Sequence, residues 1–408
     1  MPIGVGIGMG FGGRRRARLF AASFSTLTPG VASTLFGLSH TRGSGATVQT
    51  GTSSVVSGLG TDVAGIGRAL DSDPLGLVIE ETRTNYALRS ADIGNAAQWS
   101  PVALAAQTSN NDPSPDGTTS TGRISSDGTT ATHFVIGPTS VAAGAAVFSA
   151  YGLQGTGRWV ALYAEGGGAG RYFDMQAGVV GAAGGAATGS IVAAGAYWKC
   201  GLAFTATLAS QLRLYLASAD GTVSFTGTGA YIGLWGMQLE NGAWISEYIP
   251  AVAANATRAG ARIWHPSAAT LIDGGRLSLR MVLQAKGANA DYSTDPYLWR
   301  IDASNYARIA SATGVVTTVV GGSSHSTALG VTWAKGDVLD VRLEVGSSRN
   351  GVCRIGKNGG ALTSLDTSPA AQGALSGSVL DLLQDGSAAN VLSCRLRSFE
   401  AYRAGGMP

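Results

Sequence analysis

The segment 231–239 places the tightest limit on how this 408-residue chain can fold. Its odd and even positions are both largely apolar, so neither side suits a solvent-exposed surface. Because strand side chains alternate between two faces, the segment predicts a strand covered on both sides, with Gly233 and Gly236 leaving room for a neighbouring sheet or backbone. The segment 245–250 then ends in a proline, and small residues run on to Arg258. This pattern predicts the last core strand of a domain and its exit linker.

Composition favours strands over helices. The chain has 61 glycines, roughly twice the usual share, and glycine costs about 1 kcal/mol relative to alanine inside a helix. Only 13% of residues are charged, whereas 45% are hydrophobic, which argues for packed cores rather than disorder. No helical periodicity of useful length is present. The sequence therefore predicts an all-β fold.

Charge and cysteine content exclude several classes of protein. The formal net charge is +3, and the basic residues are scattered apart from one short run, which does not indicate nucleic-acid binding. The three cysteines, Cys200, Cys353 and Cys394, lie in apolar segments outside any CxxC motif. We expect buried free thiols, with a bridge between Cys353 and Cys394 as the alternative. We also expect folding in a reducing host cytoplasm.

The first 20 residues do not match a signal peptide. Their apolar run precedes the basic cluster and is interrupted by glycine at alternate positions, the reverse of a secretory signal. No stretch reaches 18 uninterrupted apolar residues, so we expect no transmembrane helix and no membrane insertion.

The order of turn signals and apolar segments predicts four regions. We expect an extended N-terminal arm at residues 1–52 and a small collar that mediates oligomerisation at 53–90. Two β-sandwiches follow at 91–258 and 259–408, because short strand candidates recur there between turn signals. The collar has too few apolar residues to bury a core alone, so we expect copies of the chain to complete one another.

Several sequence pieces resemble a known family in content and in order: GLVIEETRTNYALRS, PDGTTSTG, AYWKCGLAFTAT, LYL, YIGLWGMQLENGAWISEYIP and ATR. Together they resemble a module of structural proteins from tailed bacteriophages and related gene-transfer particles. In that module, a VE-RTN lead-in and a W-QLE-G exit bracket a jelly roll similar to a carbohydrate-binding module. The resemblance covers about residues 75–258. This chain departs from it at Glu247, where serine or threonine is usual, and in a Gly/Ala-rich insert at 177–196.

The region from about 263 to 403 looks like a laminin-G or concanavalin-A-type sandwich. The DASN turn at 302–305, the run from Trp333 to Val345 and the closing strand at 392–402 carry this likeness. Both resemblances imply a virion adhesin: a tail fibre, head fibre or spike that binds host cell-surface glycans. They further imply a homo-oligomer, with a trimer favoured and a pentamer as the alternative, attached to capsid or tail proteins on the virion surface.

Glycan binding would use aromatic rings that stack on sugar faces, surrounded by hydrogen-bonding groups. Each candidate ring lies in or beside a predicted strand and could instead pack in a core. The residues in the loop ADYSTDPY are expected to be the most exposed. The candidates are Trp159, Tyr163 and Tyr172 in the first sandwich, and Tyr292, Tyr297 and Trp299 in the second.

Glycan cleavage would need two carboxylates about 5–10 Å apart, on either side of the bond. The best strand candidate carries Asp337, Asp340 and Glu344, at spacings of three and four that we expect to place neighbours on opposite faces. We also expect the side chains of the adjacent residues Glu80 and Glu81 to point to opposite faces. We therefore expect no enzyme.

Two further features bear on cofactors and partners. Asp291, Asp295 and Asp302 could supply oxygen ligands to calcium, but solvated loop acids are the favoured explanation, and we expect no other cofactor. The basic run consists of Arg14, Arg15, Arg16 and Arg18. We expect it to attach the arm to an acidic surface of the particle rather than to nucleic acid.

The expectation is thus a non-enzymatic virion fibre or spike with two displayed β-sandwiches. Two alternatives stay open: a purely structural capsid-decoration or minor tail protein, and a capsule polysaccharide depolymerase that uses Asp340 or Glu344.

Overall fold

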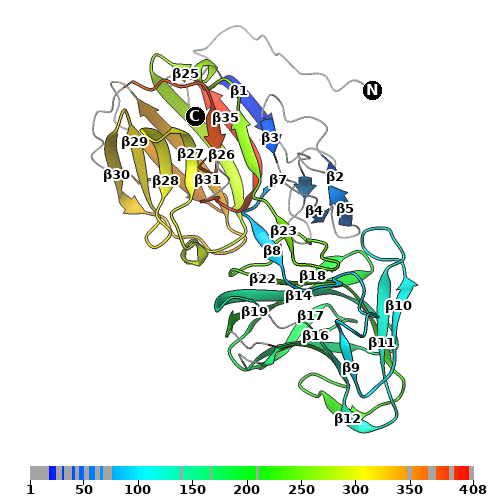
Figure 1. Cartoon of the computed structure of the whole chain (residues 1–408). Coiled ribbons are helices and arrows are strands. Elements are labelled where there is room, and N and C mark those ends of the chain that lie inside the picture. Colours follow the sequence, from blue (N-terminus) through cyan, green and yellow to red (C-terminus); the bar gives the residue numbers. More distant parts are fainter. Residues whose placement is uncertain are drawn as a thin grey trace.

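The chain is all-β, as predicted (Figure 1). The computed structural model describes residues 79–137, 141–165, 168–207, 211–346, 352–365, 374–385 and 390–403, together with the backbone of seven short strands between residues 18 and 79. Helical structure in these ranges is limited to short 3-10 turns such as Ala268–Thr270 (η2) and Asn289–Asp291 (η3). None of the described helices is long and apolar enough to cross a membrane.

The first sandwich consists of two six-stranded sheets. The first sheet runs β10 (Leu104–Asp112), β11 (Thr121–Ser126), β22 (Tyr231–Asn241), β14 (Gly144–Gln154), β19 (Tyr197–Ala206) and β18 (Thr188–Ala194). The second runs β17 (Val179–Gly184), β16 (Ala169–Asp174), β15 (Trp159–Ala164), β20 (Leu212–Ala217), β13 (Phe134–Ile136) and β9 (Ser100–Val102). A small pair, β12 (Thr130–Thr132) and β21 (Ser224–Thr226), extends from one end. The core between the sheets includes Phe148, Leu202 and Leu239 of the first sheet and Leu162 and Phe173 of the second.

Strand β22 lies in the middle of its sheet and is covered on both sides, as its sequence predicts. It pairs with β11 on one edge and β14 on the other. Leu234 and Met237 belong to the core, while Trp235 packs on the opposite face against Tyr151. Gly236 has a φ of +63° beside a register shift, and the space above it is filled by the Tyr151 ring rather than by a neighbouring backbone.

The second sandwich pairs a ten-stranded sheet with a seven-stranded sheet. The larger sheet runs β2 (Gly30–Val31), β6 (Gly65–Gly67), β7 (Gly76–Ile79), β35 (Cys394–Tyr402), β26 (Arg276–Ala285), β31 (Val338–Gly346), β32 (Val352–Lys357) and β33 (Thr363–Ser364), with β1 (Arg18–Ser23) on β35 and β25 (Ile272–Asp273) on β26. The smaller sheet runs β3 (Ser39–Thr41), β24 (Arg262–His265), β34 (Leu380–Leu382), β27 (Tyr297–Asp302), β28 (Asn305–Ile309), β29 (Val315–Val320) and β30 (Ser323–Gly330).

The N-terminal strands join this second sandwich, which differs from the expected separate arm and collar. Strand β1 pairs with β35, β3 pairs with β24, and β7 pairs with β35. Of the described N-terminal strands, only β4 (Ala46–Gln49) and β5 (Val55–Leu59) pair solely with each other. Free strand edges offer unpaired backbone groups, and the N-terminal strands occupy such edges (blue in Figure 1).

The exit segment of the first sandwich is inserted into the second. A short pair, β8 (Arg83–Asn85) with β23 (Ala256–Arg258), lies between the two sandwiches. Trp244, which follows β22, packs in the core of the second sandwich, with its ring 4.9 Å from the Tyr292 ring. The segment that ends the first domain therefore also anchors it to the second.

The three cysteines are buried free thiols, as predicted. Burial raises the pKa of both Cys200 and Cys394 far above the usual value for a thiol.

Candidate functional site

An aromatic surface lies on the outward side of the second sheet of the first sandwich. On β15, Val160 and Leu162 point into the core, so the alternation of strand side chains places Trp159 and Tyr163 on the opposite side. Strands β13, β16 and β20 alternate in the same way and contribute three more rings. We call this set the aromatic face; it consists of Phe134, Trp159, Tyr163, Tyr172 and Tyr215.

The rings of the aromatic face pack against one another across neighbouring strands. The Phe134 and Tyr215 rings are stacked, with centroids 4.7 Å apart. The Tyr163 ring meets those of Tyr215 and Tyr172 edge to face, at 5.2 Å and 6.1 Å. Trp159 and Tyr163 are half-buried, whereas Tyr172 is only 4% exposed. Trp159 and Tyr163 are thus the rings of this set with surface free for a ligand.

Two glycines let the Tyr163 ring lie close to the neighbouring strands. A Cβ at Gly170 would lie 2.5 Å from its ring carbons, and a Cβ at Gly184 would lie 2.7 Å from its hydroxyl. A side chain at either position would therefore push the ring away from the sheet. The Gly/Ala-rich insert, which contains Gly184, supplies part of this support.

Polar groups border the aromatic face at one end. Tyr215 donates its hydroxyl to Glu165 Oε1 at 2.9 Å, and Arg213 Nη1 lies 3.1 Å from the same oxygen. The Arg213 guanidinium also lies over the Phe134 ring, 5.1 Å from its centroid, and donates to Gln211. Carboxylate, guanidinium and amide groups thus lie beside a layer of rings.

The structure brings together only one of the two predicted aromatic sets. Trp159, Tyr163 and Tyr172 share the aromatic face. In the second sandwich, Trp299 is fully buried and Tyr292 is 8% exposed, with its hydroxyl bonded to the Ser393 carbonyl. The expectation that Tyr292 is exposed is therefore wrong, because its loop folds back over the core. Neither residue presents a ring face.

Tyr297 is half-buried and packs edge to face with Tyr306 at 5.3 Å, apart from the others. Sequence reasoning also missed Phe134, Tyr215, Arg213 and Glu165 as members or neighbours of the aromatic face. The alternation in β20, in which Leu212, Leu214 and Leu216 form the core side, was the available signal for Arg213 and Tyr215.

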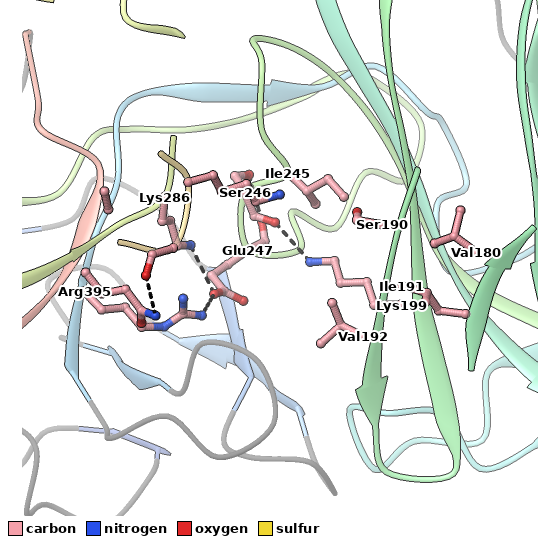
Figure 2. A pocket seen from close by; sticks show the side chains of 14 residues that line it. Val180, Ser190, Ile191, Val192, Lys199, Ile245, Ser246, Glu247, Lys286 and Arg395 are labelled. Carbon is pink, nitrogen blue, oxygen red and sulfur yellow. Dashed lines mark hydrogen bonds and ion pairs between the residues drawn. The ribbon is translucent and has the colours of Figure 1, made fainter. Parts of the chain in front are cut away.

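A second site lies where the two sandwiches meet. A hollow of about 420 Å³ is bordered by β18 and β19 of the first sandwich, the exit segment, and residues of the second sandwich. A neighbouring hollow of about 580 Å³ shares Ser190, Ile245 and Lys335 with it. We call the two together the junction cleft. Figure 2 shows Lys286 and Arg395 converging on Glu247 from one side and Lys199 approaching from the other.

A buried network of ion pairs forms one wall of the junction cleft. Glu247 Oε1 lies 3.2 Å from Lys286 Nζ and 3.1 Å from Arg395 Nη2. Behind it, Glu80 pairs with both Lys286 and Arg258. Burial opposes ionisation of Glu247, but Lys286, Arg395 and Lys199 outweigh that effect and hold its pKa below the usual value.

The carboxylates considered for catalysis are placed differently from expectation. Leu339, Val341 and Leu343 fill the core side of β31, so Asp340 and Glu344 share its outward side. The prediction that these two carboxylates point to opposite faces is therefore wrong. Strand side chains alternate with a period of two, so residues four apart lie on the same face. Asp340 accepts hydrogen bonds from Arg280 and Arg342, each at 3.0 Å. Burial opposes ionisation of Asp340, but these arginines outweigh that effect and hold its pKa below the usual value.

The calcium candidates do not form a common site. Asp291 accepts a hydrogen bond from the Ala288 amide and Asp302 from the Ser304 amide, so each of these two stabilises its own turn. Asp295 accepts from the amide of the distant Ser311. Across the described ranges, no group of three or more metal-ligating side chains comes together. Arg14, Arg15 and Arg16 lie outside the described residues, and of Arg18 only the backbone, in β1, is described.

No protein-family model matches this chain, and no curated protein matches it in sequence.

Proposed function

We propose that this chain is a non-enzymatic virion structural protein, a fibre or spike, that binds host cell-surface glycans through the aromatic face. The virion assignment is supported by the order of the sequence pieces between residues 75 and 258, and the first sandwich is compatible with the jelly-roll fold that this resemblance implies. A homo-oligomer attached to capsid or tail proteins belongs to the same proposal.

The aromatic face is the observation that carries glycan binding. A sugar ring has apolar C–H faces that pack on aromatic rings and hydroxyls that need hydrogen-bond partners at its rim. Trp159 and Tyr163 supply half-buried rings, and Glu165, Arg213 and Gln211 supply donors and acceptors beside them. The face therefore combines the two kinds of contact that a saccharide requires.

The ionisation of Asp340 supports a function without catalysis. A glycosidase needs one carboxyl group whose pKa is raised so that it can donate a proton. Asp340 is instead held ionised by Arg280 and Arg342. It is therefore unsuited as a general acid.

The proposal is tested with the full chain on an array of bacterial surface polysaccharides. We expect binding to a restricted set of glycans that is lost in the Trp159→Ala/Tyr163→Ala double variant. The control is Tyr306→Ala, which removes a half-buried ring from the second sandwich. Equal binding by the double variant would refute the aromatic face as the site. Failure of the chain to bind any glycan would favour the purely structural role, and release of reducing ends would favour a depolymerase.

A further inference from the structure

The lysines of this chain are concentrated in one place. The sequence contains 24 arginines but only four lysines: Lys199, Lys286, Lys335 and Lys357. Three of the four line the junction cleft. They come from β19, from the connection after β26 and from the connection before β31, so the fold gathers them from both sandwiches. The fourth, Lys357, pairs with Asp337 and lines neither hollow.

Positive charge exceeds negative charge around the junction cleft. Its lining contains four cations, the three lysines and Arg395, but only two carboxylates, Glu247 and Asp291. Glu247 is already shared by Lys286 and Arg395. Glu80, behind the wall, is matched by Arg258 as well as by Lys286. The protein's own acids therefore do not balance the cations that face the cleft.

Two of the lysines, Lys199 and Lys335, form no salt bridge with a carboxylate among the described residues. Lys199 is 8% exposed, and its ammonium, which has three donors, makes one described hydrogen bond, to the Ser246 carbonyl at 3.1 Å. Within the described part of the chain, Lys335 makes no ion pair or hydrogen bond. Lys335 is exposed as a residue, yet its pKa is lowered, first by burial of the ammonium and then by repulsion from Lys286 and Lys199. Cations crowded in this way are stabilised by an anion placed among them.

The rest of the lining defines the size and polarity of such an anion. Val180, Ile191, Val192 and Ile245 are the apolar side chains of the lining. Figure 2 shows Val180, Ile191 and Val192 on the side away from Lys286 and Arg395, with Ile245 on the exit segment. A hollow of about 420 Å³ falls within the range of small-molecule sites, roughly 300–1,000 Å³. Lysine ammoniums are compact charges with rotatable donors that suit a single oxyanion group, whether carboxylate or phosphate.

From these observations we propose that the junction cleft binds a small organic anion, a sugar-sized ligand carrying a carboxylate or a phosphate, through Lys199, Lys335 and the Lys286–Arg395 pair. The apolar side chains of the lining contact the body of the ligand, and the lysines contact its oxyanion. Because the ligand would contact both sandwiches, its binding also stabilises their arrangement. This site is separate from the aromatic face, and its existence does not depend on the proposed function.

The test is a ligand-observed NMR titration of the full chain with three probes: glucose, glucuronate and glucose 6-phosphate. We expect binding of one or both anions and not of glucose, with weaker binding at about 0.5 M salt, where charge interactions are screened. Lys335→Gln should weaken binding by about tenfold or more, as expected for the loss of one charged contact. Its exposure means that the substitution should leave the fold intact, and circular dichroism verifies this.

The control is Lys357→Gln, which removes the same charge from the one lysine outside the cleft and should leave binding unchanged. Preference for glucuronate assigns a carboxylate ligand, and preference for glucose 6-phosphate assigns a phosphate. Failure of both anions to bind, binding equal to that of glucose, or an equal loss in Lys335→Gln and Lys357→Gln would overturn the proposal. Trp159→Ala/Tyr163→Ala should not affect this titration, which separates the two sites.

Discussion

Arg395 of the last strand donates a hydrogen bond from Nη2 to Glu247 Oε1 at 3.1 Å, and this contact ties the second sandwich to the exit segment of the first. Lys286 contacts the same carboxylate from the end of β26. These two salt bridges of the buried Glu247 therefore form only when the two sandwiches are in contact.

We predict that Glu247→Gln destabilises the chain by about 3–5 kcal/mol, because it leaves Lys286 and Arg395 buried without their shared carboxylate. Denaturant unfolding measures the change. The matched control is Asp112→Asn, which removes one partner of a more exposed pair with Arg123 and should cost no more than about 1 kcal/mol. Equal effects of the two substitutions would contradict the role assigned to Glu247.

The same carboxylate gives a pH dependence with a defined sign. Its folded-state pKa is lower than the usual value of 4.5, so the ionised group stabilises the fold fully above that pH. As the pH falls through the folded-state pKa, protonation removes this stabilisation. Unfolding measured at a series of pH values should show the difference between wild type and Glu247→Gln narrowing below about pH 4.5. A stability difference between wild type and Glu247→Gln that stays constant down to pH 3 would exclude the Glu247 carboxylate as the source of the pH dependence.

Gly236 is predicted to be sensitive to substitution for two reasons. Its φ of +63° is unfavourable for other residues, and a Cβ would lie 2.8 Å from the Tyr151 ring. Gly236→Ala should therefore cost more than about 1 kcal/mol of unfolding free energy. Gly117→Ala tests the backbone effect alone, because Gly117 has a φ of +82° with no heavy atom within 4 Å of an added Cβ. If Gly117→Ala loses as much unfolding free energy as Gly236→Ala, the contact with the Tyr151 ring does not explain the effect at Gly236.

The thiols provide a direct check on packing. Cys200, Cys353 and Cys394 are buried and free, and burial raises the pKa of Cys200 and Cys394. We expect a thiol reagent such as Ellman's to react with none of them in the native chain and with all three after denaturation. Rapid reaction of the native chain would show that these strands open readily.

Part of the fold follows from local patterns in the sequence. The largely apolar segments at 159–164 and 315–320 are strands with those bounds, and the turn at 302–305 joins β27 to β28. The low-complexity insert contains two strands, β17 and β18, where short apolar pairs interrupt the glycines and alanines. In each case a short run of β-branched, aromatic or other apolar residues marks the strand.

Other features depend on partners distant in sequence. Strands β10 and β30 are polar and lie at sheet edges, so they carry no apolar alternation. The pairing of β1 with β35 joins residues at opposite ends of the chain. Likewise, nothing near Glu247 in the sequence indicates that Arg395 neutralises it. The aromatic face was predicted only in part, because a ring on a strand points inward or outward according to the sheet that covers it.

The most direct test of the account is the affinity of the full chain for a glycan that it recognises, measured by isothermal titration calorimetry with Tyr163 variants. Tyr163 is a half-buried ring of the aromatic face and lies beside Tyr172 and Tyr215. We predict that Tyr163→Ala weakens binding by about tenfold or more, equivalent to a loss of about 1.4 kcal/mol. Tyr163→Phe, which keeps the ring, should retain most of the affinity. Unchanged affinity in Tyr163→Ala would contradict glycan binding by the aromatic face.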